Sequence, residues 1–329
     1  MIRLFILAVI LKSSFGFKDP QFDSQVRLCI DFIMNHSYSK ADSICSLVIN
    51  KNPDHPAGYA MSFLLCQYKM LDYFDTTGLN KCSDIFKKGL SVTEKKIKLD
   101  SDDTVSLYFR AVLYGARSYM NVKFGNYFKG FSDGIISVKL YNRLIKLSPG
   151  CCDAQGSLGT YYYWKGVYLN FLPFFDEERS HGIQMLERAV KCFSYLRSTS
   201  IYSYLWVKFH EREYEKALEI TETILEKYKS NRSFKRSKAD CLFNLKEWRK
   251  AEKIYKDLLN DFKNPPFSRV YYIEILAKLA HIAEMTGRMD DYVYYLKAII
   301  SCPVNEWEKG FVEKQLAWAG YSLEELGDK

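Results

Sequence analysis

Apolar residues recur every three or four positions from Phe17 to the C-terminus. That spacing places them on one face of an α-helix, whereas a half-buried strand would need strict alternation, which no segment shows. Prolines just beyond an apolar run are natural helix stops. The resulting turns fall at Asn52-Pro53, Ser148-Pro149-Gly150, Asn264-Pro265-Pro266 and Cys302-Pro303. The sequence therefore predicts an all-α protein of helices joined by short turns.

A helical hairpin repeats within this pattern. Tyr214-x-x-Ala217 and Trp248-x-x-Ala251 lie 34 residues apart, and each would begin the second helix of a hairpin. The same register places Leu205 and Ala239 on the first helices, opposite the two alanines. Small residues at these positions, such as Ala217, Ala239 and Ala251, let paired helix backbones approach closely. The pattern predicts a right-handed superhelical solenoid of antiparallel helical hairpins.

Further units follow the same register less regularly. Near the C-terminus, Ala280, the turn residue Gly287 and Tyr292 mark a third hairpin, displaced by a longer loop over residues 264–270. Near the N-terminus, Tyr38-x-x-Ala41 and Cys45 mark another. Residues 57–147 fit the pattern poorly and predict two longer hairpins. The amphipathic segment 306–326 predicts the capping helix that such arrays need.

The segment Leu158-Gly159-x-x-Tyr162 matches the first helix of a hairpin, with Gly182 in the second helix, predicted over residues 180–192. Eleven extra residues separate the two helices, around Gly166–Phe175. Residues 28–53 and 150–305 resemble tetratricopeptide repeat proteins. The hairpin from Gly159 to Leu186 is similar to one in bacterial exported tetratricopeptide proteins. It is more remotely similar to the inclusion-body-clearance and tetratricopeptide-repeat-39 families.

This resemblance implies a binding scaffold in the bacterial cell envelope. We predict four segments: a signal peptide at 1–16, divergent helical hairpins at 17–150, a repeat array at 151–305 with an insertion near 166–176, and a capping helix at 306–329. Departures from the repeat consensus, such as Tyr292 in place of alanine and Thr221 in place of an aromatic residue, leave the repeat boundaries open.

The N-terminus has the order of a secretory signal: a basic start, eight uncharged apolar residues from Leu4 to Leu11, and small residues at Ser14 and Gly16. Eight residues are too few to span a bilayer. The alternative is an ordinary first helix, which would make the protein an intracellular scaffold. Nine cysteines, an odd number, favour buried free thiols such as Cys29 and Cys45, with one or two disulfides possible in an oxidising compartment.

The net charge of +8 is spread along the chain rather than focused in a stripe, so the sequence does not favour nucleic-acid binding. The five histidines form no metal-binding motif, and no phosphate loop, dinucleotide fingerprint or nucleophile motif is present. We therefore predict a protein that is not an enzyme and uses no cofactor or metal.

The positions that face the concave surface of a tetratricopeptide array give the candidate partner-binding residues. They are mostly aromatic and polar, and aromatic rings are good anchors at protein interfaces. The set is Tyr163, Trp164, Tyr202, Trp206, Phe209, His210, Arg236, Asp240, Phe243, Asn244 and His281. The expected partner is a protein or peptide, and some of these rings would instead pack between repeats.

Two alternatives remain open. A carbohydrate-binding or carbohydrate-processing helical array would also use aromatic platforms, flanked by carboxylates and amides. The apolar insertion Phe171–Phe175 either folds back over its hairpin or contacts a partner or a membrane surface.

Overall fold

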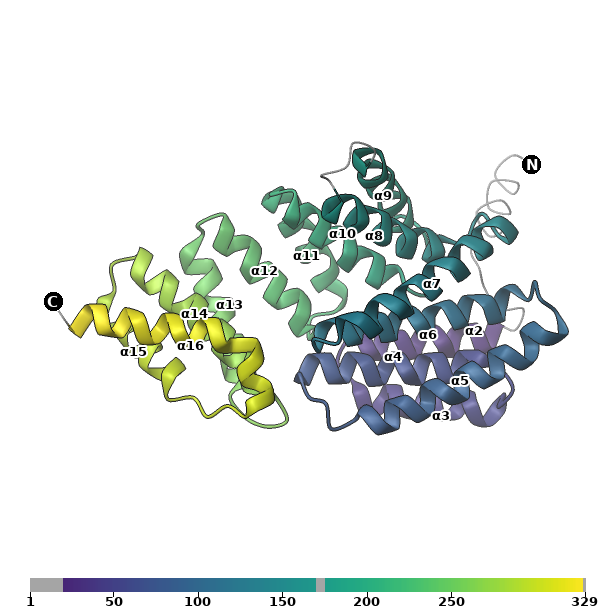
Figure 1. Ribbon diagram of the computed structural model, residues 1–329, viewed down its shortest axis with the longest axis horizontal. Coiled ribbons are helices and arrows are strands. Elements are labelled where there is room, and N and C mark those ends of the chain that lie inside the picture. The colour runs from purple at the N-terminus through teal and green to yellow at the C-terminus, as the bar shows by residue number, and fades with distance from the viewer. Residues whose placement is uncertain (1–19, 170–174, 328–329) are drawn as a thin grey trace. The chain divides into compact units, whose positions relative to one another are not determined.

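The computed structural model describes residues 20–169 and 175–327. The predicted signal peptide and the part of the insertion at 170–174 lie outside these residues. Every regular element in the described part of the chain is a helix, so the predicted all-α class is confirmed (Figure 1). The helices of the first half are α2 (Pro20–Met34), α3 (Tyr38–Lys51), α4 (Pro56–Tyr73), α5 (Leu79–Leu99), α6 (Thr104–Lys123), α7 (Tyr127–Leu147) and α8 (Cys152–Tyr168).

The second half continues in the same way. Its helices are α9 (Phe175–Ala189), α10 (Arg197–His210), α11 (Tyr214–Lys227), α12 (Arg232–Asn244), α13 (Trp248–Phe262), α14 (Arg269–Met285), α15 (Met289–Ile300) and α16 (Glu306–Gly327). Helices that follow one another along the chain pack as pairs, including α2 with α3, α6 with α7, α8 with α9, α12 with α13 and α14 with α15. The starts of α11 and α13 at Tyr214 and Trp248 confirm the predicted register.

The chain forms two compact units. One comprises the residues up to Leu71 together with Thr77–Glu211, and the other comprises Asp72–Thr76 together with Arg212 onward. The predicted segments had a boundary at residue 150 instead. The unit continues past that point because α8 packs against α7, and α10 packs against both α8 and α9.

Small residues bring the paired helices together, as the register predicts. Ala217, Ala239 and Ala251 are fully buried. Gly159 and Gly182 approach closely, and a Cβ added at Gly182 would lie 2.7 Å from the carbonyl oxygen of Gly159. The α6/α7 hairpin follows the same rule despite its weak sequence match, since Ser118 Oγ donates to the carbonyl of Gly130 at 2.7 Å.

The turns inside the hairpins share one backbone conformation. The residue two positions before the second helix has a positive φ in five of the described turns: His36, Gly125, Arg212, Lys246 and Gly287. This left-handed conformation suits glycine, and other residues adopt it at a cost. Gly125 and Gly287 therefore fit their turns without strain, whereas His36, Arg212 and Lys246 do not.

Short stretches outside the repeats complete the second unit. Phe74 is buried and its ring lies 4.9 Å from that of Phe311 in α16. Arg232 Nε donates to Asp72 Oδ1 at 2.9 Å. Glu308 in the first turn of α16 accepts from Ser268 Oγ (2.7 Å) and from its own N-cap residue's backbone, so the predicted capping helix is locked to the start of α14.

The cysteines divide into bonded and free groups. Cys66 pairs with Cys82 and Cys152 pairs with Cys192, so the two-disulfide alternative is the one observed. Cys29 and Cys45 are buried free thiols, as predicted, with their sulfur atoms 3.0 Å apart.

Candidate functional site

The predicted partner-binding residues fall into two groups, one in each unit. Those from α8 and α10 belong to the first unit and those from α12 and α14 belong to the second. Each group is held by hydrogen bonds and ring contacts among its own members and their neighbours. We call the two groups the α8/α10 cluster and the α12/α14 cluster.

The α8/α10 cluster is organised around Tyr163. This side chain is completely buried, and its hydroxyl hydrogen bonds with Nδ1 of His210 at 2.7 Å and donates to Glu211. Arg179 from α9 donates to the same carboxylate through Nε at 3.1 Å. The network ties the end of α10 to α8 and α9. It positions His210, whose side chain is 43% exposed.

Burial and hydrogen bonding act in opposite directions on Glu211. Partial burial raises the pKa of its carboxyl group, but the hydrogen bonds from Tyr163 and Arg179 outweigh it, and the pKa lies below its usual value. Burial raises the pKa of the Tyr163 hydroxyl, and the Glu211 carboxylate raises it further. The cluster is therefore a neutral tyrosine beside a paired carboxylate and guanidinium.

Partly exposed rings surround this network. Trp164 lies 5.2 Å from the His210 ring and 6.0 Å from the Tyr168 ring, and Tyr168 is largely exposed. On α10, Trp206 contacts Phe209 at 5.0 Å and Tyr202 at 6.1 Å. Five of the six predicted residues in this unit are therefore partly exposed to solvent.

Tyr163 is the exception among the predicted residues. Because it is completely buried, its ring cannot contact a partner, and its role is to hold His210 and Glu211 in place. Sequence reasoning also missed Arg179 and Glu211. These two residues lie 32 positions apart, and nothing in the local sequence of either residue predicts that they form an ion pair.

The α12/α14 cluster is organised around Phe243. Its ring contacts Trp248 at 5.3 Å and His281 at 5.4 Å, and the ammonium group of Lys278 lies 4.2 Å from its centre. A cation over an aromatic face is attracted by the negative charge density of the ring. The structure therefore brings together the predicted residues Phe243 and His281 and adds Lys278, one turn before His281 on α14.

Hydrogen bonds, an ion pair and a stacking contact with neighbouring residues hold the polar members of this cluster in place. Asp240 accepts a hydrogen bond from the buried Tyr255 hydroxyl at 2.7 Å, and Asn244 Nδ2 donates to the Asp240 carbonyl at 2.8 Å. Burial raises the pKa of the Tyr255 hydroxyl, and the nearby Asp240 carboxylate raises it further. Arg236 stacks on Tyr271 at 4.2 Å and pairs with Glu274 at 3.5 Å. These contacts fix the side chains before any partner binds.

No protein-family model matches the sequence, and a search of curated proteins gave no match. Several solved structures are similar in arrangement. A tetratricopeptide repeat protein from Parabacteroides merdae has 11% identity and a TM-score of 0.41, covering 91% of this chain and 100% of that one. PilF from Pseudomonas aeruginosa has 14% identity and a TM-score of 0.43, covering 79% and 99%. The apo form of RapI has 13% identity and a TM-score of 0.46, covering 92% and 87%.

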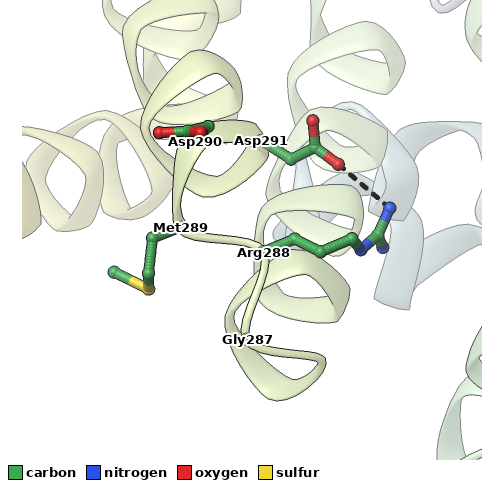
Figure 2. Close-up of a pocket in the computed structure, with 5 residues that line it drawn as sticks. All are labelled: Gly287, Arg288, Met289, Asp290 and Asp291. Carbon is green, nitrogen blue, oxygen red and sulfur yellow. Dashed lines mark hydrogen bonds and ion pairs between the residues drawn. The ribbon is translucent and has the colours of Figure 1, made fainter.

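This protein folds into tetratricopeptide-type helical hairpins. The helix starts, the buried small residues and the shared turn conformation show this fold, whereas the identities and TM-scores of the similar structures are low. The tetratricopeptide-type hairpins of the second unit also form a shallow depression at one turn. Figure 2 shows it, lined by Gly287–Asp291. Arg288 there pairs with Asp291 at 3.0 Å within the turn.

The depression offers little to a ligand. All its lining residues come from a single turn, and Arg288 also donates to Glu252 of α13 at 2.9 Å, so its guanidinium is already engaged. Among residues 20–169 and 175–327, no group of three or more metal-binding side chains comes together. None of the described helices combines the length and apolar character needed to cross a bilayer.

Proposed function

We propose that this protein is a non-enzymatic scaffold that binds a protein or peptide through the first helices of its hairpins. The observation that supports this function best is the α12/α14 cluster. There the Phe243 ring contacts Lys278 and His281, and Arg236 on the same helix α12 stacks on Tyr271. Side chains that are ordered before binding lose less entropy when a partner arrives, which raises affinity.

The proposed ligand is an extended peptide with aromatic or acidic side chains, because Phe243, Lys278 and Arg236 would recognise these groups. Aromatic residues and arginine supply much of the binding energy at protein interfaces. The α8/α10 cluster, with Trp164 and Trp206, would offer a second aromatic surface.

Selection of peptides from a random displayed library on the full chain would test the function. Affinities of the selected peptides would then be compared between the parent protein, Phe243→Ala and Trp206→Ala. A true anchor should lose about 2 kcal/mol, or roughly thirtyfold in Kd, with little change in stability. Tyr294→Ala on the second helix α15 is the matched control, since Tyr294 is 66% exposed. Equal losses in all three variants, or no selected peptide, would refute the proposal.

We further propose that the protein acts in the bacterial cell envelope. Two features support export: the signal-like order of residues 1–16 and the two disulfides, which persist in oxidising compartments. N-terminal sequencing of the protein from its native cells should begin at or near Phe17. Recovery of a chain that begins at Met1 with all thiols reduced would contradict export.

One observation favours the carbohydrate alternative. Trp164 and Tyr168 form a tilted pair beside His210, close to the ion pair of Arg179 and Glu211, and glycan sites often combine a ring platform with charged groups. A glycan array probed with the parent protein and with Trp164→Ala separates the two functions. Binding that depends on Trp164 and not on Phe243 would support the glycan site.

A further inference from the structure

The tip of the α6/α7 hairpin exposes an unusual number of apolar side chains. Phe128 is 90% exposed, and Phe131 and Tyr127 are 69% and 68% exposed. Tyr119 and Val122 on the last turns of α6 are also exposed. We call these five residues the aromatic tip. Apolar groups gathered in this way on a protein surface mark a site of contact with a partner or a membrane.

Helix geometry places the three most exposed rings on one face. Positions three and four apart are neighbours on a helix, so Phe131 lies beside both Tyr127 and Phe128 at the start of α7. Gly130 lies on a different face of the helix, and this face approaches α6 so closely that a Cβ there would meet Val122 Cγ2 at 2.6 Å. The rings therefore point away from the hairpin interior.

The tip is fixed by its own backbone. Asn126 N donates to the Asn121 carbonyl at 2.8 Å, and Ser118 Oγ donates to the Gly130 carbonyl at 2.7 Å. Just beneath, Arg117 donates to the buried Asp133 carboxylate at 2.7 Å through Nε. Because the hairpin end is already closed and hydrogen bonded, the exposed rings of Tyr127, Phe128 and Phe131 are available for an external contact.

Charge indicates the kind of surface that the tip would meet. Lys123 and Lys129 are exposed beside the rings, and residues 104–132 contain no Asp or Glu. Lysine is depleted at protein interfaces, whereas an anionic lipid surface attracts each nearby lysine. Lysine stems can also lie along an apolar surface while the ammonium groups reach lipid phosphates. A protruding tip of rings and lysines matches the lipid headgroup region better than a protein groove.

We propose that the aromatic tip docks this protein onto an anionic phospholipid surface. Phe128, Phe131 and Tyr127 insert into the headgroup region, and Lys123 and Lys129 contact lipid phosphates. The hairpin lies on the bilayer and does not cross it. This docking is independent of the proposed peptide binding, because no residue of the tip belongs to the α8/α10 or α12/α14 cluster.

Vesicle sedimentation with the full chain tests this proposal. The parent protein should bind vesicles of equimolar phosphatidylcholine and phosphatidylglycerol, and should bind pure phosphatidylcholine weakly. The double variant Phe128→Ser/Phe131→Ser should bind the anionic vesicles about tenfold or more weakly. About 0.5 M salt should also weaken binding, because it screens the lysines. Residues 1–16 are present in every variant, so any contribution from their apolar run is shared.

Leu99→Ser is the matched control. Leu99 is also 90% exposed, but it is the last residue of α5 and precedes the start of α6, whereas the aromatic tip lies at the end of α6. This control should leave vesicle binding unchanged, and circular dichroism should show that all variants are folded. Equal vesicle binding by the parent and the double variant would overturn the proposal. So would a parent dimer that the double variant converts to a monomer while neither binds vesicles, since the tip would then be a surface between two copies of this chain.

Discussion

Gly182 in α9 lies against Gly159 in α8 at a distance that no larger residue permits. A Cβ on Gly182 would lie 2.5 Å from the backbone nitrogen of Tyr163 and 2.7 Å from the Gly159 carbonyl oxygen. Both neighbours are backbone atoms, which cannot move aside as a flexible side chain can. This contact sets the spacing of the hairpin that carries Tyr163 and Trp164.

Gly182→Ala should therefore lower the free energy of unfolding by about 3 kcal/mol, because the helices must separate. Gly310→Ala in α16 is the control. Nothing lies within 4 Å of a Cβ at Gly310, so the added methyl group should stabilise the helix by about 0.5–1 kcal/mol. Urea denaturation measures both. A Gly182 variant as stable as the parent would show that α8 and α9 do not approach this closely.

Replacing Lys246 with glycine should stabilise the protein, because it relieves backbone strain in the turn between α12 and α13. Lys246 has a φ of 59°, a conformation that costs a non-glycine residue about 1–2 kcal/mol. Since glycine also gains entropy in the unfolded chain, the net stabilisation from Lys246→Gly should be about 0.5–1 kcal/mol. Thermal melts of this variant and of Lys253→Gly, which should be destabilised by about 1 kcal/mol within α13, check the sign. Destabilisation by both variants would contradict the assigned turn.

His55 should make the protein less stable in mild acid. Burial lowers the pKa of its imidazole to about 4, and the positive charge of Lys96 contributes. The ring packs 4.6 Å from Phe22, and Nδ1 accepts a hydrogen bond from Ala57 N at 3.2 Å. Because the folded state holds His55 neutral, the stability that it contributes is complete above about pH 6.5. That contribution is lost as the pH falls toward 4.

Between pH 7 and pH 5 this loss should amount to about 2 kcal/mol in the free energy of unfolding. His55→Asn removes the titrating group, so its stability should change less over the same interval. Urea titrations of both proteins at the two pH values provide the measurement. A parallel decline in parent and variant would mean that His55 is protonated in the folded protein.

The disulfide between Cys152 and Cys192 should contribute strongly to stability. It closes a separation of 40 residues, and loop closure on this scale restricts the unfolded chain by about 4 kcal/mol. Cys152→Ser/Cys192→Ser should therefore be less stable than the parent by about 2–4 kcal/mol in oxidising buffer. Cys302→Ser, a free and partly exposed thiol, is the control and should change little. Peptide mapping that finds both cysteines alkylated in the native protein would contradict the pairing.

The sequence predicted the helices and their register well. The starts of α11 and α13, the burial of Ala217 and Ala251, and the extent of α16 all follow from local rules of helix periodicity, small residues at crossings and proline stops. These rules act within a turn or two of the chain. The α6/α7 hairpin falls in the predicted range 57–147 but fits the repeat consensus poorly, because it uses Ser118 and Gly130 at its crossing in place of the consensus residues.

The candidate binding residues were predicted less completely. Helical phase placed Phe243 and His281 correctly on adjoining first helices, where they contact each other. The same phase offered Tyr163 as a surface residue, although it is buried beneath Arg179 and Glu211. Helical phase predicts the direction in which a side chain leaves its own helix. It does not predict which residues of another helix will cover that side chain.

For this protein, the sequence by itself determined the helical class, the hairpin period and the turn positions, because each depends on residues near one another in the chain. Only the tertiary structure decided which cysteines pair, where the unit boundary falls after Glu211, and which apolar side chains stay exposed at the α6/α7 tip. Those outcomes depend on contacts between helices far apart in sequence. Phe128 and Phe86 look alike in the sequence, yet Phe128 on the first turn of α7 is exposed, whereas Phe86 in α5 is buried because rings from α4 and α6 pack against it.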